Sequence, residues 1–190
     1  MKLNRSSQSG ASLIEVLIAV LILSFGMLAL GGMMVYAIQA PKLAAYRATA
    51  AAQAGAYVER MRANKVGFAA NQYASTGSEP ITYKEANPAV YAITSCSYPN
   101  CTPQQIAELD AKETLQTLRR ELSTLSGMRV TCNGACNSGE GDLWIMWDEP
   151  QQYGGLNFSS SDECPDPSVA PAFSAFTAPL PRCVHVRFKL

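Results

Sequence analysis

The sequence predicts an α+β protein in which one long N-terminal helix packs on a small antiparallel sheet. Three observations lead to this class. A long apolar run passes into an amphipathic helical stripe, a second helix opens with a capping signal, and three later segments alternate between apolar and polar residues as strands do. The stripe of the helix and one face of the sheet both need covering, and each can cover the other.

Composition and charge argue against two broad classes of protein. The chain has 190 residues, of which 48% are hydrophobic and 16% are charged, with 15 Lys and Arg against 15 Asp and Glu. A nucleic-acid binder would normally carry a basic excess, and a disordered chain would carry fewer apolar residues. The length fits one domain with an appendage.

The apolar run is long enough to cross a membrane. None of the 26 residues from 16 to 41 is charged, and 19 of the 23 residues from 16 to 38 are apolar. A helix of that length extends about 39 Å, whereas the hydrocarbon core of a bilayer is about 30 Å thick. The alternative is a secretory signal peptide with Lys2 and Arg5 as its positive region, but such a peptide has a shorter run and a small-residue cleavage site.

Glu15 is the unusual residue of this run, because it stands at the start and unbroken apolar residues follow it. One interpretation is that it marks the membrane edge. The other is that it needs a cation once it leaves water, since a carboxylate within a bilayer is costly. Cleavage after Gly10 would create a free amine, which attracts a carboxylate strongly at low dielectric.

Residues 10–19, GASLIEVLIA, follow a short basic leader and resemble the class III signal of type IV prepilins and pseudopilins. The resemblance implies the type IV pilin fold and removal of the leader, residues 1–10, by prepilin peptidase after Gly10. It further implies N-methylation of the new terminus, Ala11, and pairing of Glu15 with the amine of a neighbouring subunit during filament assembly. The family usually has Phe or Met where this chain has Ala11, a departure that bears on methylation more than on cleavage.

The helix is expected to continue past Pro41, where the missing backbone donor predicts a kink. Residues 11–41 would form the transmembrane and filament-core helix, residues 42–64 an amphipathic continuation, and residues 65–190 the head. The stripe of the continuation consists of Leu43, Tyr46, Ala50, Ala54, Tyr57 and Met61. Glycines in the apolar half fit either local unwinding in a filament, as the resemblance implies, or close helix packing in a bilayer: Gly26, Gly31 and Gly32.

In the head, residues 65–101 are predicted to be a connector without regular structure. Thr102, Pro103 and Gln105 then form a capping signal, and Gly127 can end the helix. The leucine face of that helix is Leu115, Leu118, Leu122 and Leu125. Strands are predicted over residues 128–132, 142–148 and 184–190, with the first two joined by a loop over residues 133–141. In the last strand, alternate residues face the core: Val184, Val186, Phe188 and Leu190.

Six cysteines follow the apolar run: Cys96, Cys101, Cys132, Cys136, Cys164 and Cys183. An even number in an exported domain predicts three disulfides, and among fifteen possible pairings we expect the sequential one. The alternative, a zinc site, would need paired short spacings with further Cys or His nearby. Because the charges that flank the run are balanced, it is the cysteines that indicate an extracytoplasmic head.

The sequence predicts no enzyme, no cofactor and no metal site. A Ser-His-Asp arrangement would depend on His185, the one histidine, which alternates onto the polar face of the last strand. A surface residue of a sheet is therefore the better interpretation of His185.

Within the superfamily, residues 59–65, ERMRANK, and 71–73, NQY, resemble the end of the first helix in minor pilins of the PilV group, the type IV pilus modification proteins. The cysteine pair before the second helix and the Trp147-Asp148 strand are similar to the same group. This implies a subunit that primes or modifies pilus assembly and affects twitching motility or adhesion. Its implied partners are the major pilin, other minor pilins, prepilin peptidase, the inner-membrane assembly platform and the membrane, but no nucleic acid.

The same resemblance implies a location. The subunit would span the bacterial inner membrane once, with its head in the periplasm, and would then enter the extracellular pilus. Two alternatives stay open: a pseudopilin of a type II secretion system, and a membrane-anchored binding domain that never polymerises.

Overall fold

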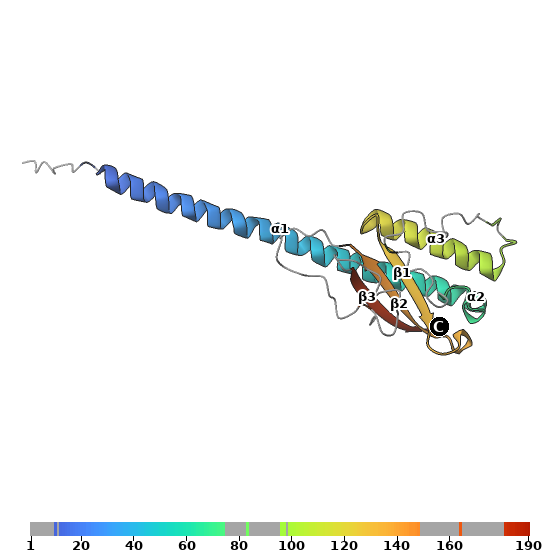
Figure 1. Cartoon of the computed structure of the whole chain (residues 1–190). Helices are drawn as coiled ribbons and strands as arrows, with labels where there is room; N and C mark the ends of the chain where they lie inside the picture. Colours follow the sequence, from blue (N-terminus) through green and yellow to red (C-terminus); the bar gives the residue numbers. More distant parts are fainter. Residues whose placement is uncertain are drawn as a thin grey trace, which may run out of the picture. The chain divides into compact units, whose positions relative to one another are not determined.

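The computed structural model describes residues 10, 12–74, 83, 96–97, 99–148, 164 and 181–190. Contacts divide the chain into two compact units, residues 1–43 and 44–190. The elements in order are α1 (Leu13–Ala63), α2 (Lys65–Ala69), α3 (Pro103–Glu121), β1 (Gly127–Cys132), the 3-10 helix η2 (Cys136–Ser138), β2 (Glu140–Trp147) and β3 (Arg182–Lys189) (Figure 1). The predicted α+β class, a long apolar helix with a small antiparallel sheet, is confirmed and is consistent with the type IV pilin fold.

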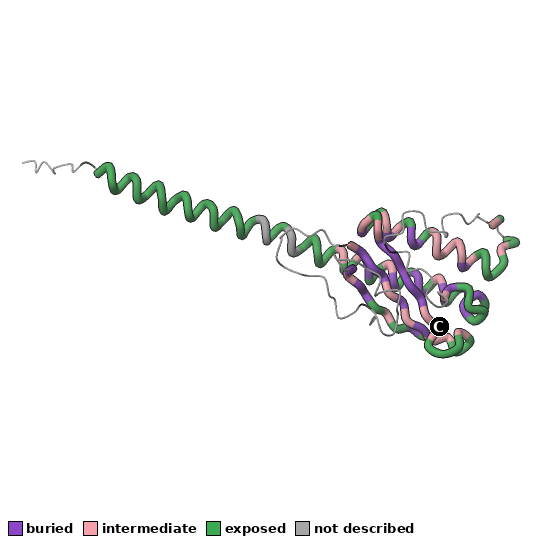
Figure 2. The backbone as a smooth tube through the Cα atoms, in the orientation of Figure 1, coloured by how far each residue is buried: buried purple, intermediate pink, exposed green. Residues whose placement is uncertain are grey.

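α1 is helical over all of its 51 residues and continues through Pro41. The kink expected at Pro41 stays a prediction. Within the second unit, the predicted stripe is the buried face, since Ala54, Tyr57 and Met61 are at most 1% exposed. Figure 2 shows the buried positions gathered in the strands and in the parts of the helices that accompany them.

The sheet is antiparallel in the order β1-β2-β3. Val130 pairs with Leu143, and Leu143 pairs with Val186, which places the three side chains on one face. That face packs on α1 and α3 in a core whose members include Ala50, Ala54, Tyr57, Met61, Leu115, Leu118, Val130, Leu143, Ile145, Trp147, Val184 and Phe188. The inward residues predicted for the last strand are buried or partly buried, and His185 is exposed.

Gly141 allows the aromatic side chain of β3 to lie across β2. A Cβ at Gly141 would stand 2.7 Å from the Phe188 ring and 2.7 Å from the Thr131 carbonyl oxygen. Neither neighbour has room for it, so glycine is required here by close approach.

α3 begins where the capping signal predicts. The Thr102 hydroxyl accepts a hydrogen bond from the Gln105 backbone N–H at 3.2 Å, and the Thr102 N–H donates to the Gln105 side chain at 2.9 Å. The predicted end was wrong, because the helix stops at Glu121 and Gly127 opens β1. A turn intervenes, in which Ser126 N–H donates to Ser123 O at 3.0 Å and Ser123 N–H donates to the Ser126 hydroxyl at 3.1 Å.

The prediction of an irregular connector was wrong at its start, where residues 65–69 form α2. Asn64 stabilises the first turn of α2, since its side-chain oxygen accepts from Gly67 N–H at 3.2 Å. Its amide nitrogen donates to Pro103 O at 2.7 Å and to the Tyr73 hydroxyl at 3.1 Å. Asn64 thereby joins the end of α1 and α2 to the start of α3.

An ionic network holds α3 beside α1. Arg60 contacts Asp110 at 3.3 Å and Glu113 at 2.7 Å, and Tyr73 donates its hydroxyl proton to Asp110 at 2.6 Å. Burial of the Tyr73 ring and its hydrogen bond to Asp110 raise the pKa of the Tyr73 phenol well above its usual range. Burial likewise raises the pKa of Tyr57, whose ring meets the Tyr73 ring edge to face.

Candidate functional site

The first turn of α1 presents Glu15 on its surface. The helix begins at Leu13, and Ser12 O accepts hydrogen bonds from Glu15 N–H at 3.0 Å and from Val16 N–H at 3.2 Å. A carboxylate in the first turn is favoured by the partial positive charge of the helix N-terminus. Gly10 and Glu15 are both exposed, and Ala11 lies outside the described residues.

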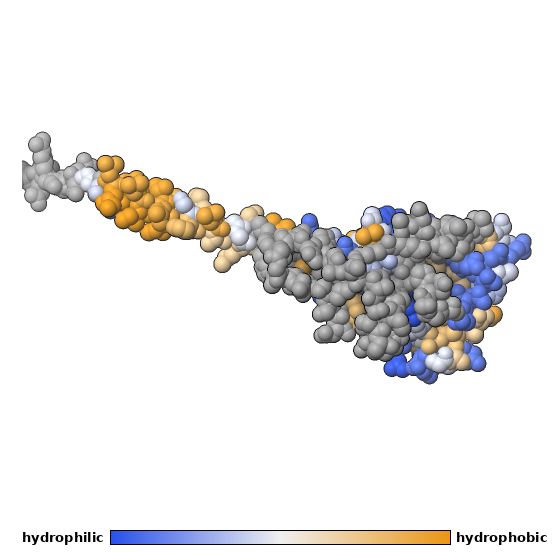
Figure 3. Space-filling model, in the orientation of Figure 1, coloured by the Kyte–Doolittle hydropathy of each residue, from blue (hydrophilic) through white to orange (hydrophobic). Residues whose placement is uncertain are grey.

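Glu15 is followed at once by a helical surface that is almost wholly apolar. The candidate membrane span runs over Leu13–Met34, with 22 residues and a mean hydropathy of 2.7, and none of it is buried within the chain. Figure 3 shows this segment as an orange surface. Its length as a helix is about 33 Å, close to the thickness of a hydrocarbon core. Such a surface needs lipid or other protein to cover it.

The three glycines in the apolar half of this helix have no close neighbours among the described residues. A Cβ at Gly26, Gly31 or Gly32 would have no neighbour within 4 Å. The described part of the chain therefore favours neither sequence interpretation, local unwinding or close helix packing, over the other.

The six cysteines form three disulfides in sequential order. Cys96 pairs with Cys101, Cys132 with Cys136, and Cys164 with Cys183, at Cα–Cα distances of 5.4, 5.0 and 5.0 Å. A zinc ion is bound by thiolates, and a disulfide sulfur is not a thiolate. Among the described residues, no group of three or more His, Cys, Asp or Glu side chains could hold a metal ion.

His185 lies on the outer face of the sheet, where β2 and β3 pair. Its Nε2 is 2.8 Å from the Asp142 carboxylate, and its ring stacks on Trp144 with the centroids 4.7 Å apart. His185, Asp142 and Trp144 therefore form a cluster of contacting side chains on the surface of the sheet. The sequence reasoning placed His185 outward but missed Asp142, because that pairing depends on the register of two strands 43 residues apart.

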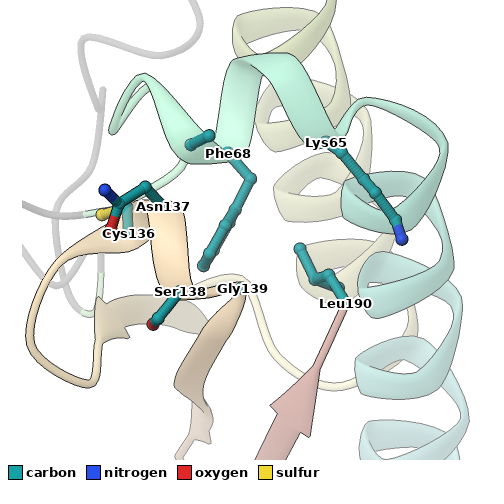
Figure 4. Close-up of a pocket in the computed structure, with 8 residues that line it drawn as sticks. Lys65, Phe68, Cys136, Asn137, Ser138, Gly139 and Leu190 are labelled. Atoms are coloured by element: carbon teal, nitrogen blue, oxygen red, sulfur yellow. The ribbon is translucent and has the colours of Figure 1, made fainter.

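A small open pocket lies between α2 and the end of β3. Its volume is about 150 Å³, whereas small-molecule sites usually measure about 300–1,000 Å³. Figure 4 shows the Phe68 ring between η2 and Leu190. The lining is completed by Lys65, Ala69, Cys136, Asn137, Ser138 and Gly139. Segments distant in the sequence meet here, so no local pattern predicted the pocket.

Residues 5–31 match the family model of the prokaryotic N-terminal methylation motif. This motif marks the type IV pilin and pseudopilin family. Gly10 and Glu15 both fall within the matched residues, as does the start of the exposed apolar helix. No curated protein and no solved structure matches the chain significantly.

The type IV pilin motif carries three further implications. It implies processing by prepilin peptidase and assembly with other pilins, and it indicates a structural, non-enzymatic protein. Together with the apolar helix, it fits a pilin anchored in a membrane.

Proposed function

We propose that the chain is a minor pilin of the PilV group, which primes or modifies assembly of the type IV pilus and thereby affects twitching motility or adhesion. Its leader, residues 1–10, would be removed after Gly10, and Ala11 would be methylated. The observation that carries the proposal is Glu15 in the first turn of an exposed apolar helix, within the matched motif.

The physical case begins with the apolar surface of α1. Leu17, Leu21 and Leu28 are 57–73% exposed within the chain, and burying one such side chain contributes about 1.5–3 kcal/mol. Before assembly, the inner membrane would cover this surface while the head lies in the periplasm. In the pilus, the helices of the major pilin and of other minor pilins would replace the lipid.

Glu15 would fix the axial position at which the subunit joins the filament. A carboxylate that enters an apolar filament core is costly unless a cation meets it. The free amine of Ala11 on a neighbouring subunit would supply the cation, and only a subunit at the correct axial position would bring the two together. Prepilin peptidase and the inner-membrane assembly platform would be the partners that act before this step.

The PilV assignment is supported by the residues that carry the resemblance. Arg60 and Tyr73 bind Asp110 of α3, Asn64 binds Pro103, and Glu59 pairs with Arg62. The ERMRANK and NQY segments thus form the junction of α1, α2 and α3. The resemblance of these two segments to the PilV group therefore concerns residues that hold the helices together, in addition to the local sequence.

The proposal is tested by replacing Glu15 with Gln and following the protein into pili sheared from the cell surface. We expect the Glu15→Gln chain to accumulate in the membrane and to be lost from the sheared fraction, because its amide cannot neutralise the amine. Glu59→Gln is the matched control, since Glu59 is an exposed acid of the same helix whose ion pair is local. Equal recovery of both variants in pili would contradict the assembly role of Glu15.

A gene deletion separates the pilus from the secretion alternative. We expect loss of twitching motility with intact export of type II secretion substrates. Loss of secretion with normal pili would assign the chain to the pseudopilins instead.

A further inference from the structure

We propose that Asn133 is a site of spontaneous deamidation, which converts it to aspartate and isoaspartate in the folded protein. Asn133 and Gly134 follow β1 directly, inside the loop that the Cys132–Cys136 disulfide closes. Both residues are exposed. Glycine is the residue that offers least steric hindrance when its backbone nitrogen attacks the side chain of the preceding asparagine.

The local hydrogen bonds leave this attack open. Gly134 has a φ of 79°, and its N–H makes no hydrogen bond to any part of the chain that the structure describes. The neighbouring Asn133 N–H donates to Glu140 O at 3.0 Å, which anchors the asparagine beside its nucleophile. Water has free access to an exposed loop, and the second step requires it.

The reaction is balanced without an oxidant or an enzyme. Solvent base removes the Gly134 N–H proton, the nitrogen bonds to Asn133 Cγ, and the Cγ–Nδ2 bond breaks with loss of ammonia. The resulting succinimide adds water at either carbonyl. Opening at Cγ gives aspartate, and opening at the backbone carbonyl gives isoaspartate, with the chain continuing through the former side chain. The net change is one amide plus water converted to one carboxylate plus ammonium.

The same loop contains an internal control. Asn137 is also exposed, but the backbone N–H of the next residue, Ser138, already donates a hydrogen bond to Ala135 O at 3.0 Å. Attack at Asn137 must break that hydrogen bond, so it should be at least about fivefold slower. The proposal therefore predicts a ranking within one molecule and in one sample.

The test incubates the mature full-length chain in detergent at pH 5 and at pH 8 in ¹⁸O-water, followed by peptide mapping with the disulfides intact. We expect ¹⁸O to enter residue 133 with a rate that rises in proportion to hydroxide, as mixed aspartate and isoaspartate, ahead of residue 137. An Asn133→Gln chain should gain no label at residue 133, while residue 137 keeps its slow rate. Conversion of Asn137 before Asn133, or an unchanged Asn133 while a free peptide of residues 131–139 deamidates, would overturn the proposal.

Discussion

Asn64 is the side chain at which three helices meet, since it binds Gly67 N–H, Pro103 O and the Tyr73 hydroxyl while only 8% exposed. Asn64→Ala would leave these polar groups without their partner. We expect the free energy of unfolding to fall by about 1–3 kcal/mol, measured by urea denaturation of the mature chain in detergent. Asn137→Ala, at an exposed loop position, should change it by less than about 0.5 kcal/mol. Equal effects would show that the Asn64 bonds contribute little.

The raised pKa of Tyr73 predicts that the protein loses stability at alkaline pH. Burial and the bond to Asp110 hold the pKa of its phenol above its unfolded value of about 10. The folded state therefore binds the proton more tightly, and the stabilisation is fully present below about pH 10 and is lost as pH rises above it. We expect Tyr73→Phe to be less stable at pH 8 and to lose less stability between pH 8 and pH 11. If the free energy of unfolding depended on pH equally in Tyr73→Phe and in the unmodified chain, this role would be contradicted. Some dependence on pH should remain in the variant, because burial also raises the pKa of Tyr57.

At the scale of the element, Gly67 and Gly55 predict opposite results for the same substitution. A Cβ at Gly67 would lie 2.9 Å from Pro103 O and 2.5 Å from the Asn64 amide nitrogen, where α2 meets the start of α3. We expect Gly67→Ala to destabilise the head, with a lower urea midpoint. At Gly55 in α1, a Cβ has no neighbour within 4 Å, so Gly55→Ala should stabilise the isolated subunit by up to about 1 kcal/mol. Destabilisation of both, or stabilisation of both, would exclude this account.

Local patterns predicted the elements whose cause is local. The Thr102 capping box marked the start of α3, and apolar alternation marked β3 with its inward side chains. α2 was missed because its capping residue, Asn64, is also held by a hydrogen bond to Pro103 O, 39 residues away, and a local sequence pattern does not contain that contact. The end of α3 was missed because a serine turn, and not a glycine, stops it.

The same distinction holds for the candidate site. Gly10 and Glu15 were proposed from the sequence because the basic N-terminal segment, the acid and the apolar run form one contiguous pattern, and both fall within the matched motif, while their roles stay predictions. The Asp142–His185 pair and the pocket beside Phe68 depend on strand register and on contacts between distant segments. No periodicity in the sequence contains that information.

At the scale of the whole molecule, the two units have different physical requirements. The second unit, residues 44–190, buries its own core and carries the disulfides, whereas the span over Leu13–Met34 buries nothing within the chain. Stability of the second unit and coverage of the apolar span can therefore vary independently. The cleavage that we propose would also change the overall charge, because loss of Lys2 and Arg5 leaves 13 basic against 15 acidic side chains.

The central claim is that this chain is processed after Gly10 and joins a type IV pilus. The most direct measurement is mass spectrometry of the intact protein and of its N-terminal peptide, recovered from sheared pili. We predict a chain that begins at Ala11, carries a methyl group on its terminal amine and contains three disulfides. A protein found only in the membrane and still beginning at Met1, or one cut beyond the apolar helix, would contradict the claim.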